Sequence, residues 1–199
     1  MRIRAKGAGR RPAPVFARFR KGQEGATAIE FALVAGPFLF ALLATVEVAM
    51  VMWTSEVLDH AVATAARKIY TGEFQSSASN AGLSSKDLRT KVQKAICAEV
   101  GSLVDCGSID VDVRPICTGS TADTCGIDAF GSATMLNPVN AQKEYDASSY
   151  GYQTIGAKQI GLVTASTQYK TFFPPLSLGT LANGNRLLIS TAAFMAEPY

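Results

Sequence analysis

The stretch Gly25-Ala-Thr-Ala-Ile-Glu30-Phe31 opens an apolar run that continues to Trp53. Residues 31–46 contain no charged residue, and Glu47 is the single charge between them and Trp53. A helix rises about 1.5 Å per residue, so a run of this length crosses a hydrocarbon core of about 30 Å. The sequence therefore predicts a transmembrane helix over residues 26–53, in preference to a buried core helix.

Basic residues are concentrated before this run. Eight of the 19 Lys and Arg residues precede Gly25, against one acidic residue, so residues 1–25 carry +7 (8 minus 1) and residues 26–199 carry −4 (11 minus 15). Positive flanks of a membrane span stay on the cytoplasmic side. The charge pattern thus predicts a basic cytoplasmic leader over residues 1–25 and an extracytoplasmic domain over residues 54–199. A cleaved secretory signal would have a shorter apolar core, and an uncleaved anchor does not explain Gly25 and Glu30.

Two glutamates, Glu30 and Glu47, lie in the apolar helix, and the presence of carboxylates there needs an explanation. An unpaired charge near the bilayer centre costs several kcal/mol. If a peptidase cuts after Gly25, the new ammonium group of Ala26 can pair with Glu30 of a neighbouring chain and favour assembly in register. For Glu47, snorkelling, protonation and contact with a partner helix all stay open. Pro37, which a membrane span tolerates, joins the two glutamates as a candidate helix-assembly residue.

The rest of the chain predicts one α+β domain. Residues 54–70 continue the helix with apolar residues at helical spacing, and Thr71-Gly72 ends it. A second helix, capped by Ser84 or Ser85, presents apolar residues on one face up to Val100. Three strands follow, in an antiparallel meander packed on the helices. They are expected over residues 108–114, 160–173 and 186–196, and residues 116–157 form a long, polar, irregular loop.

Polar residues of the domain offer no catalytic arrangement, and we expect no cofactor. Asp110 and Asp112 share one face of the first strand, where a solvent-exposed face is a better explanation than calcium binding. The only histidine, His60, lies on the long helix and no C-x-x-C pair exists, so we expect no metal site. Tyr145, with Tyr150 and Tyr152, forms either a contact surface or the internal packing of the long loop.

Four cysteines, all in the predicted extracytoplasmic part, indicate disulfides rather than free thiols. They allow three connectivities. We favour Cys97 with Cys106 and Cys117 with Cys125, because the intervening segments are short.

The N-terminal motif resembles the TadE-like family of pseudopilins, which belong to tight-adherence (Tad, Flp-type) pilus machines. The shared features are the stretch Gly25-Ala-Thr-Ala-Ile-Glu30-Phe31-Ala-Leu-Val, then Pro37, Glu47 and Ala65-Ala66-Arg67, the Cys97 and Cys106 region, and the terminal Glu197-Pro198-Tyr199. The family often has Arg-Asn before the terminal Glu-Pro, where this chain has Met195-Ala196. The resemblance covers roughly residues 22–199, with a variable middle.

This resemblance implies a structural pilus subunit and not an enzyme. A prepilin peptidase would read Gly25 before the cut and Glu30-Phe31 after it. The subunit would lie in the bacterial inner membrane with a periplasmic domain. It would contact other Tad pseudopilins or the pilin, platform proteins and lipid, but no nucleic acid, and serve adherence and biofilm formation. Fibre, tip and platform stay open as its location. The alternatives are an unprocessed, membrane-anchored binding or adhesin domain and, less favoured, an anchored thiol oxidoreductase.

Overall fold

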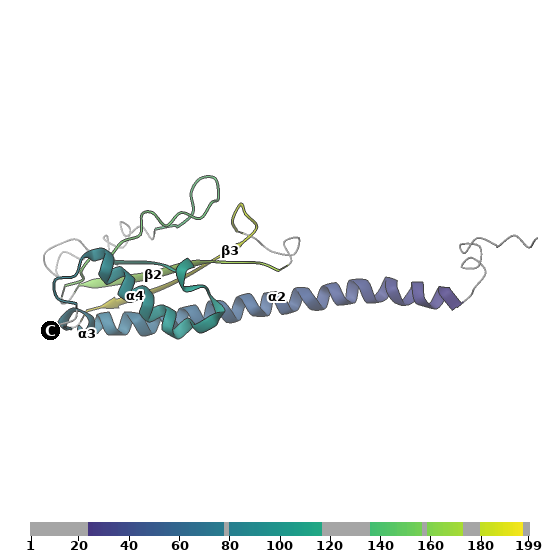
Figure 1. Cartoon of the computed structure of the whole chain (residues 1–199), viewed down its shortest axis with the longest axis horizontal. Coiled ribbons are helices and arrows are strands. Elements are labelled where there is room, and N and C mark those ends of the chain that lie inside the picture. Colours follow the sequence, from purple (N-terminus) through teal and green to yellow (C-terminus); the bar gives the residue numbers. More distant parts are fainter. Residues whose placement is uncertain (1–23, 78–79, 117–135, 157–158, 173–179, 197–199) are drawn as a thin grey trace, which may run out of the picture. The chain divides into compact units, whose positions relative to one another are not determined.

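The computed structural model describes residues 24–77, 80–116, 136–156, 159–172 and 180–196. The chain divides into two units, Met1–Thr45 and Val46–Tyr199. Helix α2 (Glu24–Tyr70) begins in the first unit and ends in the second (Figure 1).

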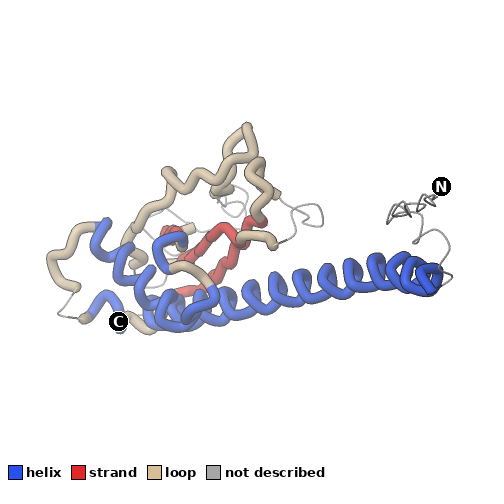
Figure 2. The backbone as a smooth tube through the Cα atoms, turned by 45° about the vertical axis from the view of Figure 1, so that its right-hand side comes forward, coloured by secondary structure: helices blue, strands red, loops and turns tan. Residues whose placement is uncertain are grey.

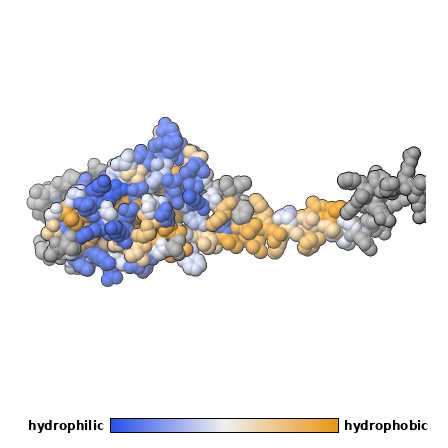
Figure 3. All heavy atoms as spheres, viewed as in Figure 1, coloured by the Kyte–Doolittle hydropathy of each residue, from blue (hydrophilic) through white to orange (hydrophobic). Residues whose placement is uncertain are grey.

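In the first unit, α2 is continuous through Pro37 and exposes nearly all of its described side chains. From Thr27 to Tyr70 this helix is long and apolar enough to cross a membrane. Its surface ahead of the folded domain is predominantly apolar (Figure 3). The predicted apolar helix is thus present.

The second unit is an α+β fold, as predicted from the sequence. The helical part of α2 that starts at Val46 is followed by two further helices, two short 3-10 turns and three strands. These elements are α3 (Glu73–Ser76), α4 (Ser85–Val100), η1 (Gly101–Leu103), η2 (Cys106–Ser108), β1 (Asp110–Pro115), β2 (Ile160–Tyr169) and β3 (Arg186–Met195). The strands form an antiparallel sheet in the order β1-β2-β3, which confirms the predicted meander. Helix α3 was not predicted, and β2 ends at Tyr169 rather than at residue 173.

The residues predicted from the sequence to end the first helix and to cap the second do so in the structure. Gly72 adopts a φ of 72°, a left-handed conformation that glycine reaches without steric cost, and this ends α2. Ser84 caps α4, because its hydroxyl accepts a hydrogen bond from the Asp87 amide.

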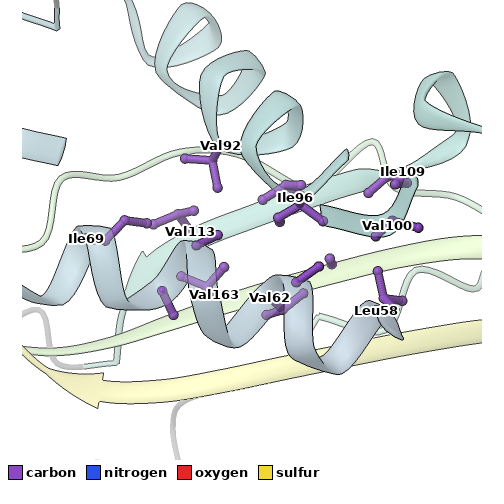
Figure 4. Packing of buried hydrophobic residues seen from close by; sticks show 14 of the residues in the cluster. Leu58, Val62, Ile69, Val92, Ile96, Val100, Ile109, Val113 and Val163 are labelled. Atoms are coloured by element: carbon purple, nitrogen blue, oxygen red, sulfur yellow. The ribbon is translucent and has the colours of Figure 1, made fainter. Parts of the chain in front are cut away.

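The core lies between the helices and one face of the sheet. Leu58, Val62 and Ile69 of α2 face Val92 and Ile96 of α4, as Figure 4 shows. Ile109, just before β1, and the two strands β1 and β2 complete the core with further buried residues, among them Val111, Val113, Val163 and Ala165. The helical and alternating spacings read from the sequence therefore identified most of this core.

The opposite face of the sheet is covered in part, over β1 and β2, by the segment 136–156 (Figures 1 and 2). The Val113 amide donates to the Gly151 carbonyl at 2.9 Å, and the Gln153 amide donates to the Val113 carbonyl at 2.7 Å. This segment therefore closes the outer edge of β1 as well as part of the face.

The predicted exposure of the acidic face of β1 is wrong for Asp112, which is 2% exposed. Its carboxylate pairs with the guanidinium of Arg114 and accepts a hydrogen bond of 2.9 Å from the Gly151 amide. The cause is the loop, which covers a face that strand alternation alone marks as polar. The same packing decides between the two interpretations of the tyrosines: Tyr150 and Tyr152 are buried, so the tyrosines are internal packing and not a contact surface.

Candidate functional site

The predicted processing motif lies at the start of α2, in the first unit. Gly25, Glu30 and Phe31 are exposed, and Ala26 has helical backbone. A Cβ atom placed on Gly25 meets no heavy atom within 4 Å among the described residues. The packing of this part of the chain therefore does not require a glycine at position 25, unlike the turn at Gly72.

Glu47 lies in the second unit and contacts a distant part of its own chain. Its Oε1 accepts a hydrogen bond of 3.1 Å from the main-chain amide of Phe172, and its side chain is only 7% exposed. Burial and, second, the charge of Glu47 raise the pKa of the Tyr169 hydroxyl above its ordinary value. The loop after β2 is thus held against α2 by a carboxylate, a contact that adds to the three interpretations left open for Glu47.

A groove of about 600 Å³ lies beside this contact. Met50 and Thr54 of α2 form one side, and Leu103 lies at the end of η1. Tyr169 is the last residue of β2, and Lys170 and Phe172 follow it. The Phe172 side chain is 74% exposed, although its amide is held by Glu47. Phe172 thus adds an exposed apolar ring to a groove that the exposed Leu103 also lines.

The disulfide predicted between Cys97 and Cys106 is present, with the two Cα atoms 5.4 Å apart. It ties the last turn of α4 to η2, immediately before β1. Cys117 and Cys125 lie outside the described residues, so their predicted pairing stays a prediction.

A part-buried polar network, which sequence reasoning missed, fixes the loop on the sheet. The Tyr145 hydroxyl donates to Asp110 Oδ2 at 2.9 Å and lies 2.9 Å from Ser166 Oγ. Arg89 of α4 binds the other oxygen of Asp110 at 2.7 Å. Burial, above all, raises the pKa of Tyr145 beyond the titration range of an ordinary tyrosine. The only signal in the sequence was the tyrosine-rich composition of the loop.

The described residues offer no catalytic arrangement that would compete with a structural role. Among them, no group of three or more His, Cys, Asp or Glu side chains lies close enough to hold a metal ion. His60 is exposed on α2, as its position in the sequence suggested.

Among the described residues, one helix near the N-terminus is long and apolar enough to cross a membrane, and it continues into a disulfide-tied α+β domain. This arrangement suggests a single-pass membrane protein. Residues 25–67 match the model of the TadE-like protein family, and this match supports a TadE-like protein of the Tad pilus system. The match runs along α2 and includes both Glu30 and Glu47. No curated protein and no solved structure matches the chain.

Proposed function

We propose that the protein is a pseudopilin or minor pilin that a prepilin peptidase cuts after Gly25 and that acts in assembly of a Tad pilus for surface adherence. The observation that carries the proposal is the match of residues 25–67 to the TadE-like family, on a helix whose N-terminal motif is exposed. The exposed Gly25 leaves the cut accessible, and the apolar surface after it is available to lipid and to neighbouring helices.

The membrane topology belongs to the same proposal. Residues 1–25 are the cytoplasmic leader, residues 26–53 the inner-membrane span and residues 54–199 the periplasmic domain. The +7 leader supports this orientation. The Cys97–Cys106 disulfide supports an oxidising compartment for the domain.

The proposed partners bind the exposed part of α2, either at its processing motif or along the apolar surface after it. The prepilin peptidase recognises Gly25 and the residues after it. Other Tad pseudopilins, the pilin and inner-membrane platform proteins contact the mature helix, and Glu30 pairs there with the ammonium group of a neighbouring Ala26. Neither alternative gains support: Tyr150 and Tyr152 are buried rather than presented to a ligand, and the spacing of the Cys97–Cys106 pair is not that of a C-x-x-C redox motif.

Processing is the property to test first. The full chain is expressed with and without a cognate prepilin peptidase, and the intact mass and N-terminal sequence of the membrane-extracted protein are measured. A mature chain that starts at Ala26, and that is lost in the Gly25→Leu variant, is expected. A chain that keeps residues 1–25 in the presence of an active peptidase would overturn the processing step and favour a permanent anchor. Gly36→Leu is the matched control, since Gly36 is exposed on the same helix and also free of close contacts.

A further inference from the structure

The hydrogen bond between Glu47 and Phe172 fixes how close a loop of the domain comes to the membrane. Trp53, the only tryptophan of the chain, follows Glu47 by six residues on α2 and is 63% exposed. Six helical residues span roughly 9 Å along the axis. If Trp53 marks the interface, as tryptophan does at the ends of spans, the Phe172 backbone is held about one and a half turns closer to the bilayer centre.

The side chains around Phe172 match the chemistry of that depth. Met50 of α2 and Leu103 of η1 border the same groove, and both are partly to substantially exposed. Lys170 is also exposed and lines the groove, where a flexible ammonium group can reach lipid phosphates while its aliphatic stem stays in an apolar environment. Asp105 is the acidic residue that lines this groove.

Exposure and burial are distributed as membrane contact requires. One polar group that hydrocarbon would penalise is satisfied within the protein: the Glu47 carboxylate is buried and accepts a hydrogen bond from the Phe172 amide. Phe172 itself is 74% exposed, although its amide is bound. Water is the less favourable environment for such a ring, because transfer of apolar surface out of water is favourable.

We propose that Phe172, together with Met50 and Leu103, inserts into the outer interface of the lipid bilayer, and that Glu47 is the positioning residue that holds the loop at that depth. The domain then contacts the membrane through two elements: the span itself and the segment 170–172 directly after β2. This inference rests on the membrane anchoring of α2 in the proposed function and adds a second lipid contact to it.

The test measures membrane depth at Phe172 with tryptophan fluorescence. Because the chain has one tryptophan, the full-length wild type reports position 53, and the Trp53→Phe/Phe172→Trp variant reports position 172. Both are reconstituted in phosphatidylcholine–phosphatidylglycerol vesicles with and without bromine on the acyl chains. Trp53→Phe/Lys86→Trp is the control, since Lys86 is an exposed residue in the first turn of α4.

Tryptophan at position 172 is expected to emit at shorter wavelength than at position 86, and to be quenched by brominated chains at least as strongly as Trp53. Water-like, unquenched emission at position 172 beside a quenched Trp53 would overturn the inference and leave the anchored pseudopilin intact. Failure of all three proteins to float with the vesicles would instead remove the membrane anchoring, and with it the proposed function.

The role of Glu47 is tested in the Trp53→Phe/Phe172→Trp variant, which reports the membrane depth of position 172. Adding Glu47→Ala removes the acceptor of the Phe172 amide and is expected to shift the emission of tryptophan 172 to longer wavelength and reduce its quenching. Adding Glu47→Gln keeps an oxygen acceptor and is expected to retain most of the quenching. Equal quenching in all three backgrounds would show that the loop needs no contact with Glu47 and would overturn the positioning role.

Discussion

Glu47 and Phe172 are 125 residues apart in the sequence and 3.1 Å apart at the contact between Oε1 and the main-chain nitrogen. This contact closes the chain on itself where the domain begins to pack against α2. It also gives a local reason for a carboxylate that the apolar helix alone leaves unexplained. A glutamate that binds its own domain has no need of a partner helix to be tolerated at this position.

We expect Glu47→Ala to destabilise the protein by about 1–3 kcal/mol, because the part-buried Phe172 amide loses its acceptor. Glu47→Gln should cost less than about 1 kcal/mol, since the amide oxygen can still accept. The measurement is urea unfolding in detergent micelles, followed by circular dichroism. Equal losses in the two variants would mean that the carboxylate charge, and not the hydrogen bond, is what stabilises the loop.

Glu30→Gln should leave cleavage after Gly25 intact and lower the yield of assembled complexes about tenfold or more, because losing 1.4 kcal/mol of pairing energy already changes an equilibrium tenfold. Glu56→Gln is the matched control, since Glu56 is another exposed glutamate of α2. Crosslinking in the membrane, with cleavage followed by mass, measures both steps. A loss of assembly in the Glu56 variant of the same size would remove the special role of Glu30.

Removing the Cys97–Cys106 disulfide should lower the free energy of unfolding by roughly 2–3 kcal/mol, because the bridge restricts a short loop of the unfolded chain. Cys97→Ser, Cys106→Ser and the double variant should lose similar amounts, as each removes the same bond. Urea unfolding under non-reducing conditions is the measurement. A double variant much less stable than either single variant would contradict the assignment of one shared bond.

Tyr145→Phe should cost about 1–3 kcal/mol near neutral pH, because Asp110 loses a buried hydrogen-bond donor. Tyr169→Phe is the control: within the described parts of the chain no hydrogen bond of the Tyr169 hydroxyl is seen, so removal of that hydroxyl should be close to neutral. Chemical denaturation at pH 7 gives both values. A larger loss for Tyr169→Phe would show that packing, and not the Asp110 network, dominates.

The same tyrosine predicts an alkaline effect. The pKa of Tyr145 is raised in the folded protein relative to its ordinary value of 10.0. The unfolded chain therefore loses the proton first, and stability is fully present below about pH 10 and falls as the pH rises above it. Between pH 9 and 11.5 the wild type should lose stability more steeply than Tyr145→Phe, by up to about 1 kcal/mol per pH unit. If the free energy of unfolding falls equally with pH in both proteins, the titration of Tyr145 is not the cause of the alkaline loss.

Gly161 of β2 should not accept a side chain. A Cβ atom there would clash with Ile155 Cδ1 and lie 2.9 Å from Phe194 Cζ. Gly161→Ala should therefore destabilise the domain by roughly 1–3 kcal/mol through overpacking. Gly151→Ala, where a Cβ atom meets nothing within 4 Å of the described structure, is the control and should be tolerated. The measurement is the thermal unfolding of both variants; equal stabilities would contradict the overpacking at Gly161.

The sequence predicted what periodicity and short-range chemistry determine. The apolar stripe of α2 and α4, the cap at Ser84, the left-handed end at Gly72 and the Cys97–Cys106 pair all depend on residues close together in the chain. The partner of Glu47 and the burial of Asp112 depend instead on segments more than 35 residues away. The sequence of a strand does not show which loop will cover its polar face. The polar face of β1 was therefore predicted to be exposed, because the segment that covers it lies far away in the sequence.

The closure of one sheet edge limits how these subunits can associate. Val113 of β1 exchanges main-chain hydrogen bonds with Gly151 and Gln153, whereas β3 is the terminal strand on the other side of the described sheet. An open-ended stack of sheets needs two available edges per subunit, one to offer and one to receive. With Val113 at the β1 edge bonded to its own loop, a second strand cannot pair with the main chain there. If the chain is a pilus subunit, as we propose, the exposed surface of α2 is then a better candidate for subunit contacts than repeated strand addition at β1.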